Sequence, residues 1–133
     1  MTFHVCVWVD HQTAKLFELT AHDAVVGKVD DTRPPHHIHR SANHVGLGTV
    51  PLDPEMMAEI GDRLGDAKAI LLVGPGKAKF ELQNYLQLHA PAVAEKIWGV
   101  EPSDHPTEPQ LIAWARSWFK AQDRMHETQA GSR

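Results

Sequence analysis

The sequence lacks several features that define common classes of protein. It has a single cysteine, Cys6, which excludes an internal disulfide and a cysteine-cluster metal site. None of its apolar runs approaches the ~20 residues that a membrane-spanning helix needs. The N-terminal segment MTFHVCVWVD has neither the basic region nor the small-residue cleavage site of a signal peptide. We therefore expect a cytoplasmic protein with no membrane partner.

Positive charge is also scarce. The 13 Lys and Arg residues oppose 17 Asp and Glu residues, which gives a formal net charge of −4 with histidine neutral. Broad, non-specific binding to nucleic acid requires a basic face that neutralises phosphates. The charge balance therefore argues against a DNA-binding protein of that kind and leaves room only for a local basic patch.

Histidine is the residue in excess. The chain has 10 His residues, and four of them lie close together in the segment 32–52, TRPPHHIHRSANHVGLGTVPL. The adjacent prolines Pro34 and Pro35 prevent a helix, and Gly46 and Gly48 permit positive φ angles. Irregular segments of this length are uncommon inside a compact domain and are often functional. The segment is therefore the first place to look for a site.

The rest of the chain predicts an α/β fold. Period-2 alternation of apolar residues predicts three short strands joined by hairpin turns, over residues 3–10, 13–19 and 24–30. Helical spacing and N-cap residues predict three helices, over residues 53–65, 77–89 and 108–126. Continuous apolar runs predict two buried strands, over residues 67–74 and 96–101.

The order of elements is therefore β-β-β-α-β-α-β-α. An antiparallel meander followed by two right-handed crossovers gives a five-stranded mixed sheet, an arrangement that resembles the ribonuclease H-like architecture. The length of 133 residues suits one domain. We expect this domain to span residues 1–126 and to be followed by a flexible tail, 127–133.

Two local features are predicted to be structural. Cys6 lies in an alternating apolar run, which is typical of a core residue rather than of a nucleophile. The segment GPGKAK, residues 74–79, places glycines and lysines before a helix, but it lacks the spacing of a P-loop. It is expected to be a tight strand-to-helix turn without a ligand.

Metal-dependent catalysis is one alternative function. Imidazoles bind zinc and similar divalent metals, and three side chains of the histidine-rich segment can supply ligands: His36, His37 and His39. Nucleases with a ribonuclease H-like architecture instead hold two metals with carboxylates. Asp10 and Glu55 or Glu59 suit two of these positions, but the fourth strand ends without a carboxylate. Asp10 is more simply a residue that caps the first hairpin turn.

An electrostatic role is the favoured interpretation. Arg33, Arg40 and the four histidines can meet phosphate, and their charge increases as the pH falls through ~6.5. Histidine and arginine side chains also stack on unpaired bases, which favours RNA over duplex DNA. The predicted RNA-binding residues are His36, His37, His39, Arg40 and His44.

Three stretches carry a resemblance to a known family: VDHQTAKLF, ILLVGPGKAKFEL and DHPTEPQL. They resemble the central domain of archaeal and eukaryotic peptide-chain release factors and of their Pelota-type ribosome-rescue relatives. The chain is also similar to the stand-alone bacterial members of that superfamily known as translational machinery proteins. The likeness runs from about Val5 to Phe119 and implies a ribosomal or RNA partner.

The resemblance does not extend to peptide release. In the release factors, the loop after the third strand carries a Gly-Gly-Gln tip, whereas this chain has no such motif and no glutamine between Gln12 and Gln83. Pelota-type proteins also lack the motif, so a ribosomal role is still implied. We therefore predict a non-catalytic ribosome- or RNA-associated protein. The alternatives are a metal-dependent hydrolase or nuclease and a homo-oligomeric adaptor domain, which would associate through the edge of the meander or the last helix.

Overall fold

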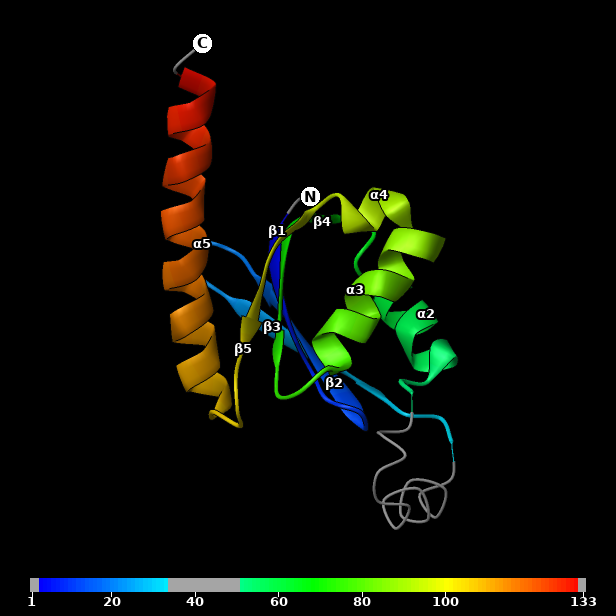
Figure 1. The fold of residues 1–133 in the computed structure, drawn as a ribbon. Helices are drawn as coiled ribbons and strands as arrows, with labels where there is room; N and C mark the ends of the chain where they lie inside the picture. The colour runs from blue at the N-terminus through cyan, green and yellow to red at the C-terminus, as the bar shows by residue number, and fades with distance from the viewer. Residues whose placement is uncertain (1–2, 34–50, 132–133) are drawn as a thin grey trace.

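The computed structural model describes residues 3–33 and 51–131, with side chains up to residue 125. Within these ranges one mixed sheet is formed by β1 (Phe3–Val9), β2 (Thr13–Leu19), β3 (Ala24–Asp30), β4 (Ala67–Gly74) and β5 (Ile97–Pro102) (Figure 1). The strand order is β3-β2-β1-β4-β5. β1 pairs antiparallel with β2 and parallel with β4, and β4 pairs parallel with β5. The predicted α/β fold with a five-stranded mixed sheet is confirmed.

Helices cover both faces of this sheet (Figure 1). One face carries α2 (Pro54–Arg63), α3 (Ala78–His89) and the short α4 (Pro91–Ala94), and the other carries α5 (Glu108–Gly131). The sequence did not predict α4. The sequence also predicted that the last helix ends at residue 126, whereas α5 continues to Gly131. The helix continues because residues 127–130 are compatible with a helix and the first helix-breaking residue is that glycine.

The alternation of side chains along β1 divides the core between the two faces. Val5, Val7 and Val9 pack with residues of α2 and α3, whereas Cys6 and Trp8 pack with residues of α5. β4 contributes to both clusters in the same way, which explains why its sequence reads as a continuous apolar run. Burial raises the pKa of the Cys6 thiol to about 12, as expected for a core residue.

Two glycines lie where elements approach closely. Gly74 ends β4 with a φ of +147°, and a Cβ atom there would overlap the carbonyl oxygen of Val9. The indole of Trp118 on α5 lies directly against Gly99 of β5. The positive φ of Gly74 and its close approach to Val9 explain why glycine is required where β4 turns towards α3. In the two ranges that the structure covers, no helix is both long and apolar enough to cross a bilayer.

Candidate nucleic-acid interface

The predicted RNA-binding residues, His36, His37, His39, Arg40 and His44, lie outside the described residues, as do the three histidines proposed as metal ligands. The structure defines instead the two points where this segment leaves and rejoins the domain. They lie after β3 and before α2, near the end of the sheet where β1 stops (Figure 1). We call the residues that connect these points the loop base: His11, Asp31, Thr32, Arg33, Leu52, Asp53, Glu55 and Glu81.

Asp53 is the centre of the loop base. It is 2% exposed. Its Oδ1 atom accepts a hydrogen bond from the backbone N–H of Glu55 at 3.1 Å, which caps α2 as the sequence predicts. Its Oδ2 atom accepts from the backbone N–H of Thr32 at 2.7 Å and from the Thr32 hydroxyl at 2.6 Å. A single carboxylate therefore joins the residues that follow β3 to the start of α2.

Asp31 holds Arg33 in a two-point contact. The Nε atom of Arg33 donates to Oδ1 of Asp31 at 3.0 Å, and its Nη2 atom donates to Oδ2 at 2.5 Å. The sequence suggested that Arg33 adds positive charge for phosphate. In the structure its guanidinium is paired with a carboxylate, so this charge is largely neutralised at the loop base.

The two aspartates of the loop base remain ionised at neutral pH. Hydrogen bonds from the Arg33 side chain lower the pKa of Asp31 below its ordinary value, against the opposing effect of burial. Burial alone would raise the pKa of Asp53, but the hydrogen bonds from Thr32 and Glu55, with the nearby charge of Arg33, lower it overall. Deprotonated carboxylates are therefore the acceptors that hold the loop base together.

Glu81 makes a second connection across the loop base. Its Oε1 atom accepts from the backbone N–H of Leu52 at 2.8 Å, and its Oε2 atom lies 2.6 Å from Nε2 of His11. His11 belongs to the turn between β1 and β2, and Glu81 lies in the first turn of α3. Neither residue is predicted from the sequence as part of a site, since they are 70 positions apart and no local pattern links them.

The carboxylates considered for a nuclease site have structural roles. Oδ1 of Asp10 accepts from the backbone N–H groups of Gln12 and Thr13, each at 2.8 Å, and so caps the hairpin turn as predicted. Glu59 pairs with Arg63 at 2.7 Å on α2. Across residues 3–33 and 51–131, no group of three or more His, Cys, Asp or Glu side chains is arranged to hold a metal ion. The described acids therefore give no support to a two-metal nuclease.

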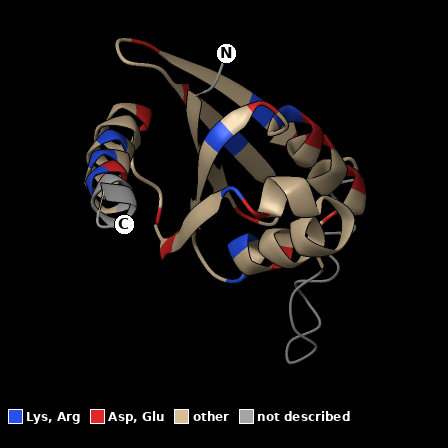
Figure 2. Cartoon of the chain, turned by 90° about the horizontal axis from the view of Figure 1, so that it is seen from above, with Lys and Arg blue, Asp and Glu red and all other residues tan. Residues whose placement is uncertain are grey.

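The loop base is acidic overall, because it contains four carboxylates and a single arginine: Asp31, Asp53, Glu55 and Glu81 against Arg33. Basic residues elsewhere are distributed over the sheet and both helical layers rather than on one element (Figure 2). A phosphate approaching the loop base would be repelled.

Solved structures share this arrangement of strands and helices, although no protein-family model and no curated protein matches the sequence. Pelota from Archaeoglobus fulgidus has a TM-score of 0.57 at 16% identity, over 98% of this chain and 40% of that one. Pelota from Thermoplasma acidophilum has a TM-score of 0.55 at 18% identity, over 81% of this chain and 30% of that one. An archaeal translation termination factor has a TM-score of 0.54 at 16% identity, over 95% and 39% of the two chains.

The chain has the fold of one domain of Pelota. It spans less than half the length of each of these proteins, so the comparison concerns that domain and not the activities of the complete factors. At these identities the likeness shows the fold alone. It confirms the architecture that the family resemblance implied from the sequence.

Proposed function

We propose that this chain is a non-catalytic domain that associates with the ribosome or with RNA, related to translation termination and rescue factors but without the Gly-Gly-Gln motif. One observation carries the proposal. In a fold shared with Pelota and an archaeal termination factor, the histidine-rich segment is the connection between β3 and α2, and a network of hydrogen bonds fixes both of its ends. This role implies a cytoplasmic location.

The contact with RNA is assigned to the segment and not to the loop base. The acidic loop base repels phosphate, and its one arginine is already paired with Asp31. We therefore assign the contact with RNA at this end of the domain to the positive charge of His36, His37, His39, Arg40 and His44. In this proposal the loop base holds the segment, and these five side chains meet phosphates and unpaired bases.

A change in pH distinguishes a contribution of histidines from one of the two aspartates in the loop base. Histidines gain charge as the pH falls through ~6.5, which strengthens attraction to phosphate. Asp31 and Asp53 have lowered pKa values and do not change charge in this range. A rise in RNA binding between neutral and mildly acidic pH therefore reports on histidines and not on these two aspartates, and the histidine variants below identify which histidines are responsible.

The test is co-sedimentation of the protein with ribosomes over a salt series, at about pH 6 and about pH 7.5. The loop variant replaces His36, His37, His39 and His44 with alanine. The matched control replaces an equal number of histidines elsewhere: His22, His89, His105 and His126.

We expect wild-type binding that weakens with salt and strengthens at the lower pH. The loop variant should lose about tenfold or more in affinity, whereas the control should stay within about twofold. Equal binding by the two variants would contradict the assignment to the loop. A wild-type protein that sediments with ribosomes under none of these conditions would contradict the proposed function itself.

A further inference from the structure

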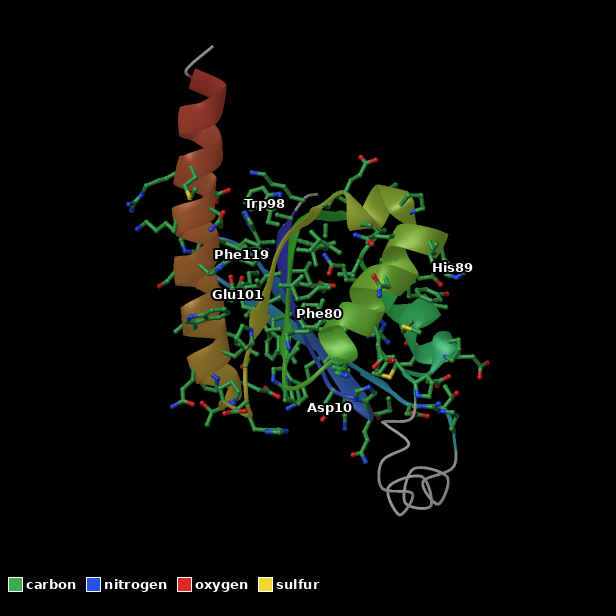
Figure 3. All side chains as sticks on the ribbon, viewed as in Figure 1. Asp10, Phe80, His89, Trp98, Glu101 and Phe119 are labelled. Atoms are coloured by element: carbon green, nitrogen blue, oxygen red, sulfur yellow. The ribbon has the colours of Figure 1, made fainter. Side chains whose placement is uncertain are left out.

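A cavity lies at the opposite end of the sheet from the loop base, between the sheet and α5. Its volume is about 530 Å³, within the ~300–1,000 Å³ typical of small-molecule pockets. Phe3 on β1 lines it, while the loop base lies beyond Val9 at the other end of that strand. Since a strand rises ~3.3 Å per residue, the two sites are separated by about 20 Å. In Figure 3, Asp10 marks the end of the sheet at the loop base, and Trp98 lies toward the opposite end.

The cavity is lined by cations whose charge is not neutralised. Lys68 on β4 and Lys120 on α5 are exposed, and neither forms an ion pair with a carboxylate in the described part of the chain. This concentration of positive charge occurs on a chain whose net charge is −4. The local potential at the cavity therefore favours an anion although the whole protein does not.

Arg116 is the third cation of the cavity. Its Nη1 and Nη2 atoms donate to the backbone carbonyls of Thr20 at 2.6 Å and Asp23 at 2.8 Å. Both acceptors are neutral, so the guanidinium keeps its charge. These bonds engage two of the ~5 N–H donors that a guanidinium carries, which leaves others for a ligand. The bonds also hold the side chain in place, which favours directional recognition.

Among the described side chains, one carboxylate lines the cavity, and it lies beside a histidine. The Asp123 carboxylate oxygens lie 3.4 Å and 3.3 Å from Nε2 of His4. The His4 ring packs in turn on Phe119 at 4.6 Å between ring centroids. Phe3, Leu19 and Phe119 give the cavity an apolar floor beside its three cations. The space is larger than a lone phosphate needs and suits a phosphate attached to an apolar, planar group.

We infer that this cavity binds a nucleotide phosphate. Lys68 and Lys120 supply exposed positive charges, Arg116 supplies oriented donors, and the apolar floor contacts the base or sugar. A free mononucleotide and the phosphorylated end of an RNA strand present the same chemistry. This site does not depend on the histidine-rich segment, so it stands or falls independently of the proposed ribosomal role.

Calorimetric titration of the complete chain with AMP, adenosine and inorganic phosphate tests the inference. The site variant is Lys68→Gln with Lys120→Gln. The control is Lys28→Gln with Lys77→Gln, which changes the net charge equally at two exposed lysines that do not line the cavity. We expect AMP to bind at least about tenfold more tightly than adenosine or phosphate. The site variant should weaken AMP binding about tenfold, and the control less than about twofold.

Each outcome is decisive. Absence of AMP binding, equal affinity for AMP and adenosine, or equal weakening by both variants would overturn the inference. Thermal unfolding of each variant verifies that the exposed substitutions leave the fold intact. Short RNA with a 5′-phosphate, compared with the same RNA carrying a 5′-hydroxyl, then identifies the source. If only the phosphorylated RNA competes with AMP, the ligand is the phosphorylated end of an RNA strand. If neither RNA competes, the ligand is a free nucleotide.

Discussion

The two ends of the β-sheet differ in the burial and pairing of their charged groups. At the loop base the carboxylates of Asp31 and Asp53 are buried and accept several hydrogen bonds each. At the cavity the cations are exposed or bonded to neutral carbonyls, and the local charge is positive. Buried and satisfied polar groups fix a structure, whereas exposed and unpaired cations attract a ligand. We therefore assign positioning of the histidine-rich segment to the loop base and ligand binding to the cavity.

Asp53→Ala should cause the largest loss of stability at the loop base. It removes the cap of α2 and the acceptor of the Thr32 backbone N–H, so we expect the free energy of unfolding to fall by about 2–4 kcal/mol. Urea denaturation measures the change. The matched control is Asp66→Ala, at an exposed aspartate, which should cost less than about 0.5 kcal/mol. Equal losses would show that Asp53 does not hold the loop base together.

Acid should weaken the loop base through the same carboxylates. Asp31 and Asp53 have pKa values below their ordinary value of 3.8, so their contribution to stability is complete above that value. It is lost as the pH falls through the lowered values. At pH values below about 4, the urea midpoint of the wild type should therefore fall. Between about pH 5 and 7, these two groups should leave it nearly constant.

The double variant Asp31→Asn with Asp53→Asn isolates this effect. It should be less stable than the wild type at neutral pH, and its urea midpoint should fall less steeply in acid. Asp62→Asn with Asp66→Asn removes the same number of carboxylates at exposed positions and should keep the wild-type slope. Identical slopes for all three proteins would rule out the loop base as a source of acid sensitivity.

Arg116→Ala probes the opposite end of the sheet. The loss of two hydrogen bonds from the guanidinium to the turn between β2 and β3 should lower the free energy of unfolding by about 1–2 kcal/mol. Amide hydrogen exchange should accelerate in residues 20–23, the turn that these bonds hold. Arg124→Ala, at an exposed position on the same helix, should leave both measurements unchanged. Unaltered exchange in the turn of the Arg116 variant would contradict this role.

His11→Ala is the mildest change at the loop base. It removes the bond to Glu81 but leaves the bond between Glu81 and Leu52, so a loss of about 0.5–1 kcal/mol is expected. Urea denaturation and hydrogen exchange at the Leu52 amide provide the measurement. His22→Ala, in the other hairpin turn, is the control. A stability loss as large as that of Asp53→Ala would contradict the expectation that the bond between His11 and Glu81 contributes little to stability.

The parts of the fold that could be predicted are those that depend on near neighbours in the sequence. The cap at Asp53 depends on a residue two positions away, and the reciprocal bonds of Thr107 and Gln110, at 3.0 Å and 3.2 Å, span one helical turn. The alternation in β1 and the continuous apolar run of β4 likewise reflect burial on one or both faces. Local patterns of this kind are visible in a single sequence.

The parts that could not be predicted depend on tertiary contacts. His11 and Glu81 meet only because the first hairpin lies beside α3. The second role of Asp53, as an acceptor for Thr32, follows from the position of β3 relative to α2. The cavity combines residues from β1, β4 and α5 that are far apart in the chain. Binding of RNA by the histidine-rich segment stays a prediction.

The burial of Cys6 makes the folded protein a convenient background for site-specific chemistry. Its thiol is fully buried, and its pKa of about 12 keeps it protonated, so reagents that attack thiolates find almost no target in the native state. The variant Asn43→Cys would then add one cysteine within the histidine-rich segment, and Cys6 would be its only other thiol. A cross-linker attached there can record which molecules the histidine-rich segment touches, with the native thiol left in place.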